Sequence, residues 1–599
     1  MMVDYLVQTL NIFSEGASRT ASSQSSLNDP EHTELQSSMI KLQSFDDALK
    51  TFTDSLQHLR SAMARHHNTL LPISRLPNDL FIEIFAIASE MKYQFIGIDN
   101  GNRRHMLETL VCVCQEWREI VHNTPSLWAH IHSNNPHMFS LESLARSGEV
   151  PLHISFFDLD NTVYEDYAVY EDFKMKIFRE VHRWKSIEMS AVNWELLKEL
   201  EQQSAPLLEK LVVWGDRKTE AGTLNLFRGS ASRLRHLTLG DITIPWESNL
   251  LSGLRTLSIS RSQGDCPSAQ QVMHILQSCP DLTSFNLRLP EIHPGPILLE
   301  HSAVELPRLE YLSINIHPLM ADHLLQRMRI PSCKIFDIGQ YGATKPIFSA
   351  AMKHLIPSLS SILLAACRVN IRITPNVLEY KATTEIDEDD DEEEEDGELV
   401  QRIHIQVFGD GLANDSAWET LSWLVDNVHT PSFSSPVSLE IRGITSPHVF
   451  THIIDGLSSA TKLDLSLTNI SSIETIVSHL GEPSKTIVDG NTTPRWPLPN
   501  LKELSFRWCS KDLEPTVVMR CIQRRAGHGF SLEGMLEDPE KLPTRLTKLS
   551  FPRGSSTTEV MRMFPDCMEW CGLELDEEDS DEEIGRGVHH GFIIDSDDD

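Results

Sequence analysis

The chain lacks the features that would place it in a secreted or membrane class. Its ten cysteines form no CxxC motif, and only Cys112 with Cys114 and Cys567 with Cys571 lie close together. Cysteines spaced this widely indicate reduced core thiols and not a disulfide framework. No uncharged apolar run reaches the roughly 18 residues that span a bilayer, and no basic residue precedes the amino-terminal apolar stretch, as in a signal peptide. We therefore expect an intracellular protein, cytoplasmic or nuclear, with no membrane partner.

A basic surface stripe able to track a phosphate backbone is also missing, so we do not expect nucleic-acid binding. The net charge of −34 is concentrated in two segments. Residues 385–398 hold twelve acids and no base, and residues 574–599 hold twelve acids and one base, so the other 559 residues carry only −11. Such runs repel themselves and stay solvated, which predicts an acidic loop at 385–398 and an acidic disordered tail at 574–599.

Residues that could carry chemistry are sparse. The adjacent pairs His66-His67 and His589-His590 lack the i, i+4 spacing of ligands on one helix face, which favours exposed side chains over a metal site. The segment RCIQRRAGHGFSLEG at 520–534 has neither the lysine nor the spacing of a phosphate-binding loop. We therefore assign no catalytic residue, no metal and no cofactor.

The amino-terminal region divides near residue 34. Residues 1–34 are rich in polar residues and are expected to be disordered. Residues 35–71 carry apolar residues at alternating steps of three and four: Leu42, Phe45, Leu49, Phe52, Leu56, Leu59 and Met63. This spacing predicts a helix that buries one narrow seam and ends before Pro72. The seam fits a coiled coil, although we favour a single amphipathic helix that packs on its own chain.

Residues 72–135 predict a compact helical domain. One helix begins near Pro77, where the missing N–H would be unpaired in any case. Its apolar stripe consists of Leu80, Phe81, Ile84, Phe85 and Ile87. A second helix is expected from Met106 to Val121, after about ten extra residues near 93–105, and its apolar face comprises Leu110, Val113, Cys114, Trp117 and Val121. The segment TPSLW closes the domain with Trp128, which we expect to be buried.

This ordered set of residues resembles an F-box. The wider frame, residues 35–135, is similar to the F-box proteins abundant in mushroom-forming (basidiomycete) fungi, which pair a heptad helix with an RLP-like entry, a VC-x-x-W helix and a TP-x-LW exit. The resemblance implies a three-helix domain that binds a Skp-type adaptor and, through it, a cullin–RING ubiquitin ligase. The adaptor-binding residues would be Leu76, Pro77, Leu80, Ile84, Phe85, Val113, Cys114, Trp117 and Trp128. The alternative is a helical core of the same residues with no link to a ligase.

Downstream, the pattern apolar-x-x-apolar-x-apolar recurs. Its middle positions are Ile187, Leu211, Leu237, Leu257, Phe285, Leu312, Phe336 and Ile362, and after the acidic run Leu463, Leu504 and Leu549. The first eight positions are 20 to 28 residues apart, within the range of leucine-rich repeats. The alternating part predicts short parallel strands, with intervening helices such as 268–280.

We therefore predict a mixed α+β and α/β fold. The amino-terminal helix and the small F-box are followed by an irregular leucine-rich-repeat-like solenoid at 136–384, which continues at 399–573. An ordinary open α/β layer is the alternative arrangement of the same strands and helices.

A phosphatase is an alternative from another class. The segment ISFFDLDNTVY resembles the first motif of haloacid-dehalogenase-type phosphatases, in which Asp158 would attack phosphorus and Asp160 would act as general acid and base, followed by Thr162. Asp410 and Asp415 resemble that family's second Mg²⁺-binding motif. Eight repeat strands are expected between the two motifs, which disfavours one doubly wound sheet.

The favoured hypothesis is therefore a non-enzymatic adaptor for ubiquitin-dependent degradation. The F-box would dock on the ligase core and the repeats would bind a target protein, so that the adaptor acts by raising the local concentration of that target. A leucine-rich scaffold with no ligase role is the third hypothesis.

Overall fold

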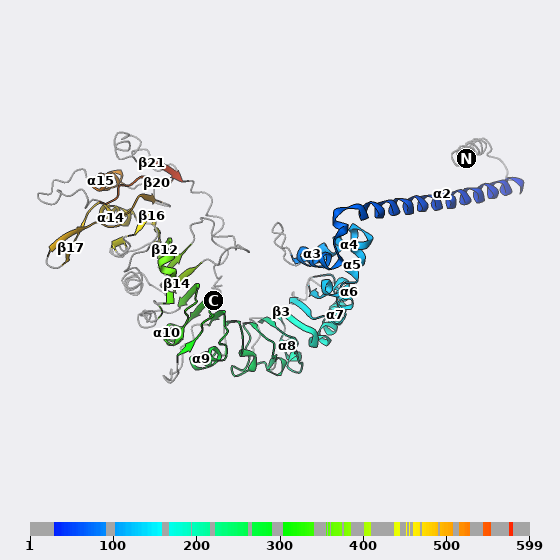
Figure 1. Cartoon of the computed structure of the whole chain (residues 1–599), viewed down its shortest axis with the longest axis horizontal. Coiled ribbons are helices and arrows are strands. Elements are labelled where there is room, and N and C mark those ends of the chain that lie inside the picture. Colours follow the sequence, from blue (N-terminus) through cyan, green and yellow to red (C-terminus); the bar gives the residue numbers. More distant parts are fainter. Residues whose placement is uncertain are drawn as a thin grey trace, which may run out of the picture. The chain divides into compact units, whose positions relative to one another are not determined.

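The structure is a computed structural model of the chain, and Figure 1 shows its helices and strands. It describes residues 29–90, 102–133, 135–157, 167–192, 194–215, 222–229, 231–261, 266–289, 303–340, 355, 358–359, 361–373, 377–384, 401–408, 437–443, 451, 454–455, 459–467, 470–488, 491–506, 514–526, 543–552 and 574–578. The chain divides into two compact units, residues 1–127 and 128–599, which we call the helical unit and the sheet unit.

The helical unit begins with one long helix, α2 (Asp29–Leu70). The helix starts six residues before the predicted boundary at 35, because Asp29 and Pro30 are residues that suit a first turn. It ends where predicted, and Pro72 begins a short 3-10 helix, η1 (Pro72–Arg75). Residues 1–28, most of the segment expected to be disordered, lie outside the described residues.

The predicted packing of the heptad seam on its own chain is wrong. Six of its seven residues are 40% to 66% exposed, and Phe45 is half-buried. The seam therefore has no apolar cover from the rest of the described chain.

Three further α-helices follow among the described residues of the helical unit: α3 (Asn78–Glu90), α4 (Asn102–Val113) and α5 (Gln115–His122). The single helix expected from Met106 to Val121 is therefore wrong, because the chain breaks at Cys114. That residue is extended, with φ −156° and ψ 171°, and caps α5. Helix α3 packs on both α4 and α5, which are joined directly at the break. Residues 91–101, which include most of the expected insertion, lie outside the described residues.

Within the described residues, seventeen strands form one large sheet. In sheet order they are β1 (His130–His132), β2 (Leu152–Phe157), β3 (Trp184–Val192), β4 (Lys210–Gly215), β5 (His236–Gly240), β6 (Thr256–Ser260), β7 (Ser284–Arg288), β9 (Tyr311–Ile316), β11 (Ile335–Gln340), β14 (Arg402–Phe408), β13 (Val377–Thr383), β12 (Arg368–Ile373), β15 (Val437–Gly443), β16 (Ala460–Leu467), β19 (Glu503–Phe506), β20 (Lys548–Pro552) and β21 (Glu574–Glu578). Every neighbouring pair is parallel except the two that involve β13.

Helices and two short strand pairs lie between these strands along the chain. The helices are α6 (His137–Arg146), α7 (Tyr167–Arg179), α8 (Trp194–Leu200), α9 (Ala269–Gln277), α10 (Pro318–Leu325), α14 (Ile470–Leu480) and α15 (Pro515–Arg525). The strand pairs are β8 (Val304–Glu305) with β10 (Met328–Arg329), and β17 (Ser484–Val488) with β18 (Asn491–Arg495). The predicted helix at 268–280 is confirmed as α9, which Ser268 and Gln271 begin with a reciprocal capping box.

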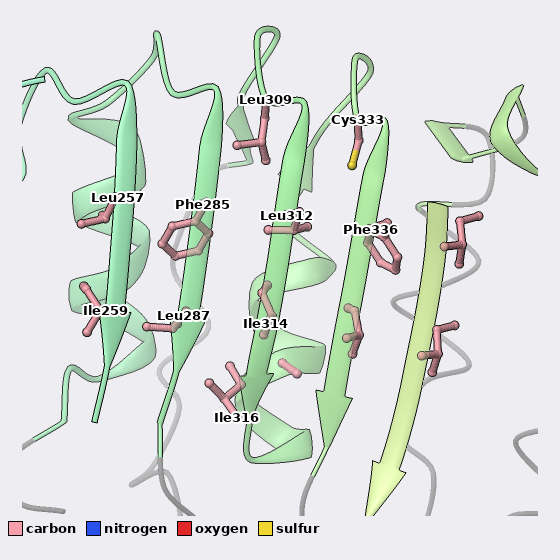
Figure 2. Close-up of a cluster of buried hydrophobic side chains, with 14 of the residues drawn as sticks. Leu257, Ile259, Phe285, Leu287, Leu309, Leu312, Ile314, Ile316, Cys333 and Phe336 are labelled. Carbon is pink, nitrogen blue, oxygen red and sulfur yellow. The ribbon is translucent and has the colours of Figure 1, made fainter. Parts of the chain in front are cut away.

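The predicted strand register is confirmed from β3 to β11. Ile187, Leu211, Leu237, Leu257, Phe285, Leu312 and Phe336 each lie opposite the next in the sheet. Figure 2 shows this row from Leu257 to Phe336, with a second row through Ile259, Leu287 and Ile314. All of these side chains are buried. A period of two in each strand therefore builds one continuous apolar face.

The eighth predicted position is wrong. Ile362 is buried, but residues 361–365 are helical, because apolar residues three apart suit a helix as well as a strand. The pattern resumes as predicted in the last part of the sheet, where Leu463, Leu504 and Leu549 lie opposite one another. Strands β12, β13 and β15 were not predicted, whereas the strand-like run before Asp410 is β14.

The acidic run is inserted between two paired strands. Thr383 of β13 lies opposite Arg402 of β14, and the backbone N–H of Thr384 donates to Gln401 O at 3.2 Å. The predicted acidic loop at 385–398 itself lies outside the described residues, as do residues 579–599 of the predicted tail. The rest of that tail differs from the prediction, because Glu574–Glu578 form β21 along β20. Backbone pairing at a sheet edge requires no apolar side chains, so an acidic segment can supply it.

No helix among the described residues is long and apolar enough to cross a membrane. The cysteines that the structure describes are all free thiols, and Cys279, Cys333 and Cys521 are buried. Burial raises the pKa of Cys333 to about 12 and that of Cys521 to about 11, so both remain protonated core residues.

We expect Leu257→Ala to lower the free energy of unfolding by about 2–5 kcal/mol, because it leaves a cavity in the buried row. Ser258→Ala, one residue along and on the opposite face, should change it by less than about 0.5 kcal/mol. Urea unfolding of the full chain measures both values. Equal losses in the two variants would contradict the assigned register.

Candidate functional site

Helix α3 carries apolar side chains on two faces. On its inner face Phe81 and Phe85 are each 1% exposed. Their rings lie 5.8 Å and 4.9 Å from the ring of Trp117 on α5, measured between centroids. Such aromatic contacts at 4.5–7 Å contribute packing and about 0.5–1.5 kcal/mol beyond burial. The inner face therefore fixes α3 against α5.

The outer face of α3 is apolar as well, yet open to solvent. Leu80, Ile84 and Ile87 are 43%, 44% and 57% exposed, and Pro77 at the start of the helix is also exposed. Steps of three, four and three residues place these four side chains in one row along the helix. We call this row the α3 stripe. Asp79 and Glu83, both exposed, flank it with negative charge.

The break at Cys114 positions this arrangement. The Cys114 Sγ accepts a hydrogen bond from the backbone N–H of Trp117 at 3.4 Å, in the way that a side chain caps the first turn of a helix. The Arg118 guanidinium donates to the carbonyl of Val111 in the last turn of α4 at 2.8 Å. The cap fixes the first turn of α5, and the Arg118 bond connects α5 to α4; together they position Trp117 beside Phe81 and Phe85. The C-x-x-W spacing therefore has a local structural role.

The nine predicted adaptor-binding residues fall into three groups. Those at least partly open to solvent are Leu76, Pro77, Leu80, Ile84 and Val113, with Leu76 half-buried. Phe85 is buried, and Trp117 and Cys114 are half-buried; these three form the core contact and the helix cap behind the α3 stripe. Trp128 belongs to the sheet unit, where its ring lies 5.8 Å from that of Phe139 and 5.2 Å from the Arg146 guanidinium.

One exposed residue was missing from the predicted set. Ile87 continues the α3 stripe and is its most exposed aliphatic member. Its helical spacing from Leu80 and Ile84 was visible in the sequence and was sufficient to include it.

A second surface lies on the polar face of the sheet. Trp214 of β4 is 41% exposed there and lies opposite Gly240 of β5. A Cβ atom at Gly240 would come within 2.0 Å of the Trp214 ring, so the indole lies across a position that only glycine can provide. An exposed aromatic held on a rigid sheet is a typical anchor of protein interfaces.

The same face carries a polar network around the hairpin of β12 and β13, which is inserted along the chain between the paired strands β11 and β14. His404 Nε2 of β14 lies 2.8 Å from Glu379 Oε1 of β13, and His404 Nδ1 lies 3.3 Å from Asp337 Oδ1 of β11. Arg402 donates to Asp337 Oδ2 at 2.8 Å. A charged His404 therefore joins carboxylates on both neighbouring strands.

The charges of this network depend on one another. Burial alone would lower the pKa of His404, but the hydrogen bonds and charges of Asp337 and Glu379 outweigh it and raise that pKa. The hydrogen bond from His404 lowers the pKa of Glu379 to about 2, against the effect of burial. Burial opposes the shift of Asp337, but His404 and Arg402 hold its pKa below the usual value. All three groups are therefore charged together in mildly acidic solution.

The phosphatase alternative has little support from the strand order. Asp158, Asp160, Thr162, Asp410 and Asp415 lie outside the described residues. Its two motifs follow β2 and β14, and seven strands separate these in the sheet. Residues after such distant strands cannot share one metal ion through neighbouring strand ends. Among the described residues, no group of three or more His, Cys, Asp or Glu side chains is arranged to hold a metal ion.

A scan against protein-family models and a search of curated proteins gave no match to this chain. Its function is therefore inferred from the two surfaces.

We expect Phe85→Ala to lower the free energy of unfolding of the helical unit by about 3–5 kcal/mol, because it empties the contact with Trp117. Leu80→Ala, on the same helix, should cost less than about 1 kcal/mol because that side chain is already 43% exposed. Urea unfolding followed by circular dichroism compares the two. Similar losses would mean that the faces of α3 are misassigned.

We also expect a pH-dependent cost for His404→Gln. A raised pKa makes the stability from His404 complete below its unfolded pKa of 6.5 and removes it as the pH rises through the folded value. The folded-state pKa values of Asp337 and Glu379 are lowered, so the stability that these carboxylates provide is lost as the pH falls below about 4. The variant should thus lose on the order of 1 kcal/mol at pH 5.5 and less at pH 8.5, measured from urea midpoints.

His236→Gln is the matched control for this pH dependence. His236 lies on β5, and burial, then Lys210 and Arg255, lower its pKa. Its loss should therefore not destabilise the protein more at pH 5.5 than at pH 8.5. The same pH dependence in both variants would exclude the network as the cause.

Proposed function

We propose that this protein is a substrate-recruiting adaptor of a Skp–cullin–F-box ubiquitin ligase. The observation that carries the proposal is the α3 stripe: Leu80, Ile84 and Ile87, with Pro77 just before the helix, are solvent-exposed, and their sequence resembles the first helix of an F-box. A contiguous apolar row of this kind is costly in water and indicates a binding surface.

The geometry of the stripe suits the helix-in-groove mode of recognition. That mode uses apolar anchors three or four residues apart on one helix face. The stripe supplies four of them on a helix whose other face is fixed by Phe81 and Phe85. Because the helix is already ordered, binding to an apolar groove on a Skp-type adaptor loses little conformational entropy. The acidic rim of Asp79 and Glu83 favours basic residues at the border of that groove.

The sheet unit would hold the target. We interpret it as an irregular leucine-rich-repeat-like solenoid, because its successive strands pair in the register of a repeat of 20 to 28 residues. Its polar face offers both an anchor, Trp214, and charged groups around His404. The ligase would then act on the target because both are held on one chain.

A leucine-rich scaffold without a ligase role is the competing function. A scaffold would also bind a partner through the sheet unit, but that function does not explain why the α3 stripe is exposed. Binding to a Skp-type adaptor therefore separates the two functions.

The test is binding of the full chain to a purified Skp-type adaptor. We expect Leu80→Ala/Ile84→Ala to weaken this binding by at least about tenfold, because each side chain would be a buried anchor. Alanine favours the helix, so the variant should keep its fold, which circular dichroism checks. Isothermal titration gives the dissociation constants.

Met138→Ala/Met175→Ala is the matched control, because it removes two exposed apolar side chains from α6 and α7, outside both the α3 stripe and α2. It should bind the adaptor as wild type does. If wild type binds no adaptor, the scaffold function replaces the proposal. If the α3 variant binds as tightly as wild type, the docking surface lies elsewhere.

A further inference from the structure

The second exposed apolar surface of the helical unit is the seam of α2. Its residues are Leu42, Phe45, Leu49, Phe52, Leu56, Leu59 and Met63. Most helices in proteins are stabilised chiefly by packing of an apolar face, and this helix of 42 residues lacks that packing. The observed contact of α2 with α5 leaves the seam open, because Arg65, which donates to Gln115 at 2.9 Å, lies outside it.

We propose that the α2 seam binds the α2 seam of a second copy of this chain, as a parallel coiled coil in register. The alternation of three and four residues extends over three heptads, which is the period at which two helices keep one seam in contact. Leu42, Leu49, Leu56 and Met63 occupy the a positions, and Phe45, Phe52 and Leu59 the d positions. A second copy has the same spacing and therefore matches every layer.

The charges beside the seam fit the same occupant. In a parallel pair, a g residue lies near the e residue five positions later on the other helix. Lys41 occupies a g position and Asp46 an e position, so each helix offers its partner one attractive pair at both symmetry-related sites. The remaining facing e and g residues over the seam place no two like charges together. The flanks therefore favour self-association.

The parallel orientation follows from the layers. An antiparallel pair that sets Leu49 opposite Leu59 also joins Asp46 to Arg60, so charge alone does not separate the two orientations. It places Leu42 opposite His66 at each end, however, and so has only six apolar layers. The parallel pair in register keeps all seven layers apolar, and hence buries more apolar surface.

The first test is the mass of the full chain in solution. We expect a dimer at micromolar concentration by light scattering after size exclusion. Leu49→Glu/Leu56→Glu should raise the dissociation constant of the dimer at least about 100-fold, because it buries charge in two layers. Glutamate has nearly the helix propensity of leucine, so any loss of helicity by circular dichroism would come from the lost packing of the seam and not from the substitution itself.

The matched control is Gln43→Glu/Gln57→Glu, which adds the same charge at b positions outside the seam. It should remain a dimer. A monomeric wild type, or a seam variant that stays dimeric with its helicity intact, would overturn the proposal. Equal loss of the dimer in both variants would also overturn it, because net charge and not the seam would then be responsible.

The second test fixes the orientation. Oxidised Leu42→Cys should form a disulfide between two copies, since equal a positions of a parallel pair approach within the usual Cα separation of a disulfide. Gln43→Cys and wild type, which keeps the exposed Cys112, are the controls and should not cross-link. A stable dimer without this cross-link would overturn the parallel arrangement. Neither test uses the adaptor, so a failure here is separate from a failure of the proposed function.

Discussion

The open edge of a parallel strand is the constraint on which the sheet unit depends. Each strand leaves a row of backbone N–H and C=O groups that only the next strand can pair. Because side chains alternate, that pairing must place Leu237, Leu257 and Phe285 on the same face. The segments between strands are free to vary, as the steps of 20 to 28 residues do. Irregular spacing is therefore compatible with one regular core.

The hairpin of β12 and β13 shows that an antiparallel strand can also pair the open edge of the sheet. Strand β11 pairs with β14, and the chain reaches β14 only after forming β12 and β13. The antiparallel β13 still keeps the buried row intact, since Ile405, Tyr380 and Ile371 lie opposite one another and are buried. On the other face, His404 connects the three strands around the insertion. The core tolerates a reversed strand because side-chain alternation is the same in both directions.

The spacing of apolar residues was sufficient to predict strands and their register. It was not sufficient to predict features that are decided by packing between distant parts of the chain. Leu211 to Phe336 were predictable because each leucine pattern sets both a strand and its register. Ile362 was not, because its spacing fits a helix equally well. On α3, the spacing indicated an apolar helix, but neighbouring Ile84 and Phe85 could each have faced the core. Packing against Trp117 resolved that choice, and the sulfur cap at Cys114 that directs Trp117 has no glycine or proline to signal it.

The two exposed apolar rows of the helical unit differ in a way that assigns them different partners. The α3 stripe is short and belongs to a helix of 13 residues whose opposite face is already packed. Such a surface presents a few anchors at a fixed angle, which suits a preformed groove on a folded partner. The α2 seam keeps the heptad period over three heptads. Only another helix of the same period can stay in contact with it along its whole length. A folded groove matches the first surface, and a second copy of α2 matches the second.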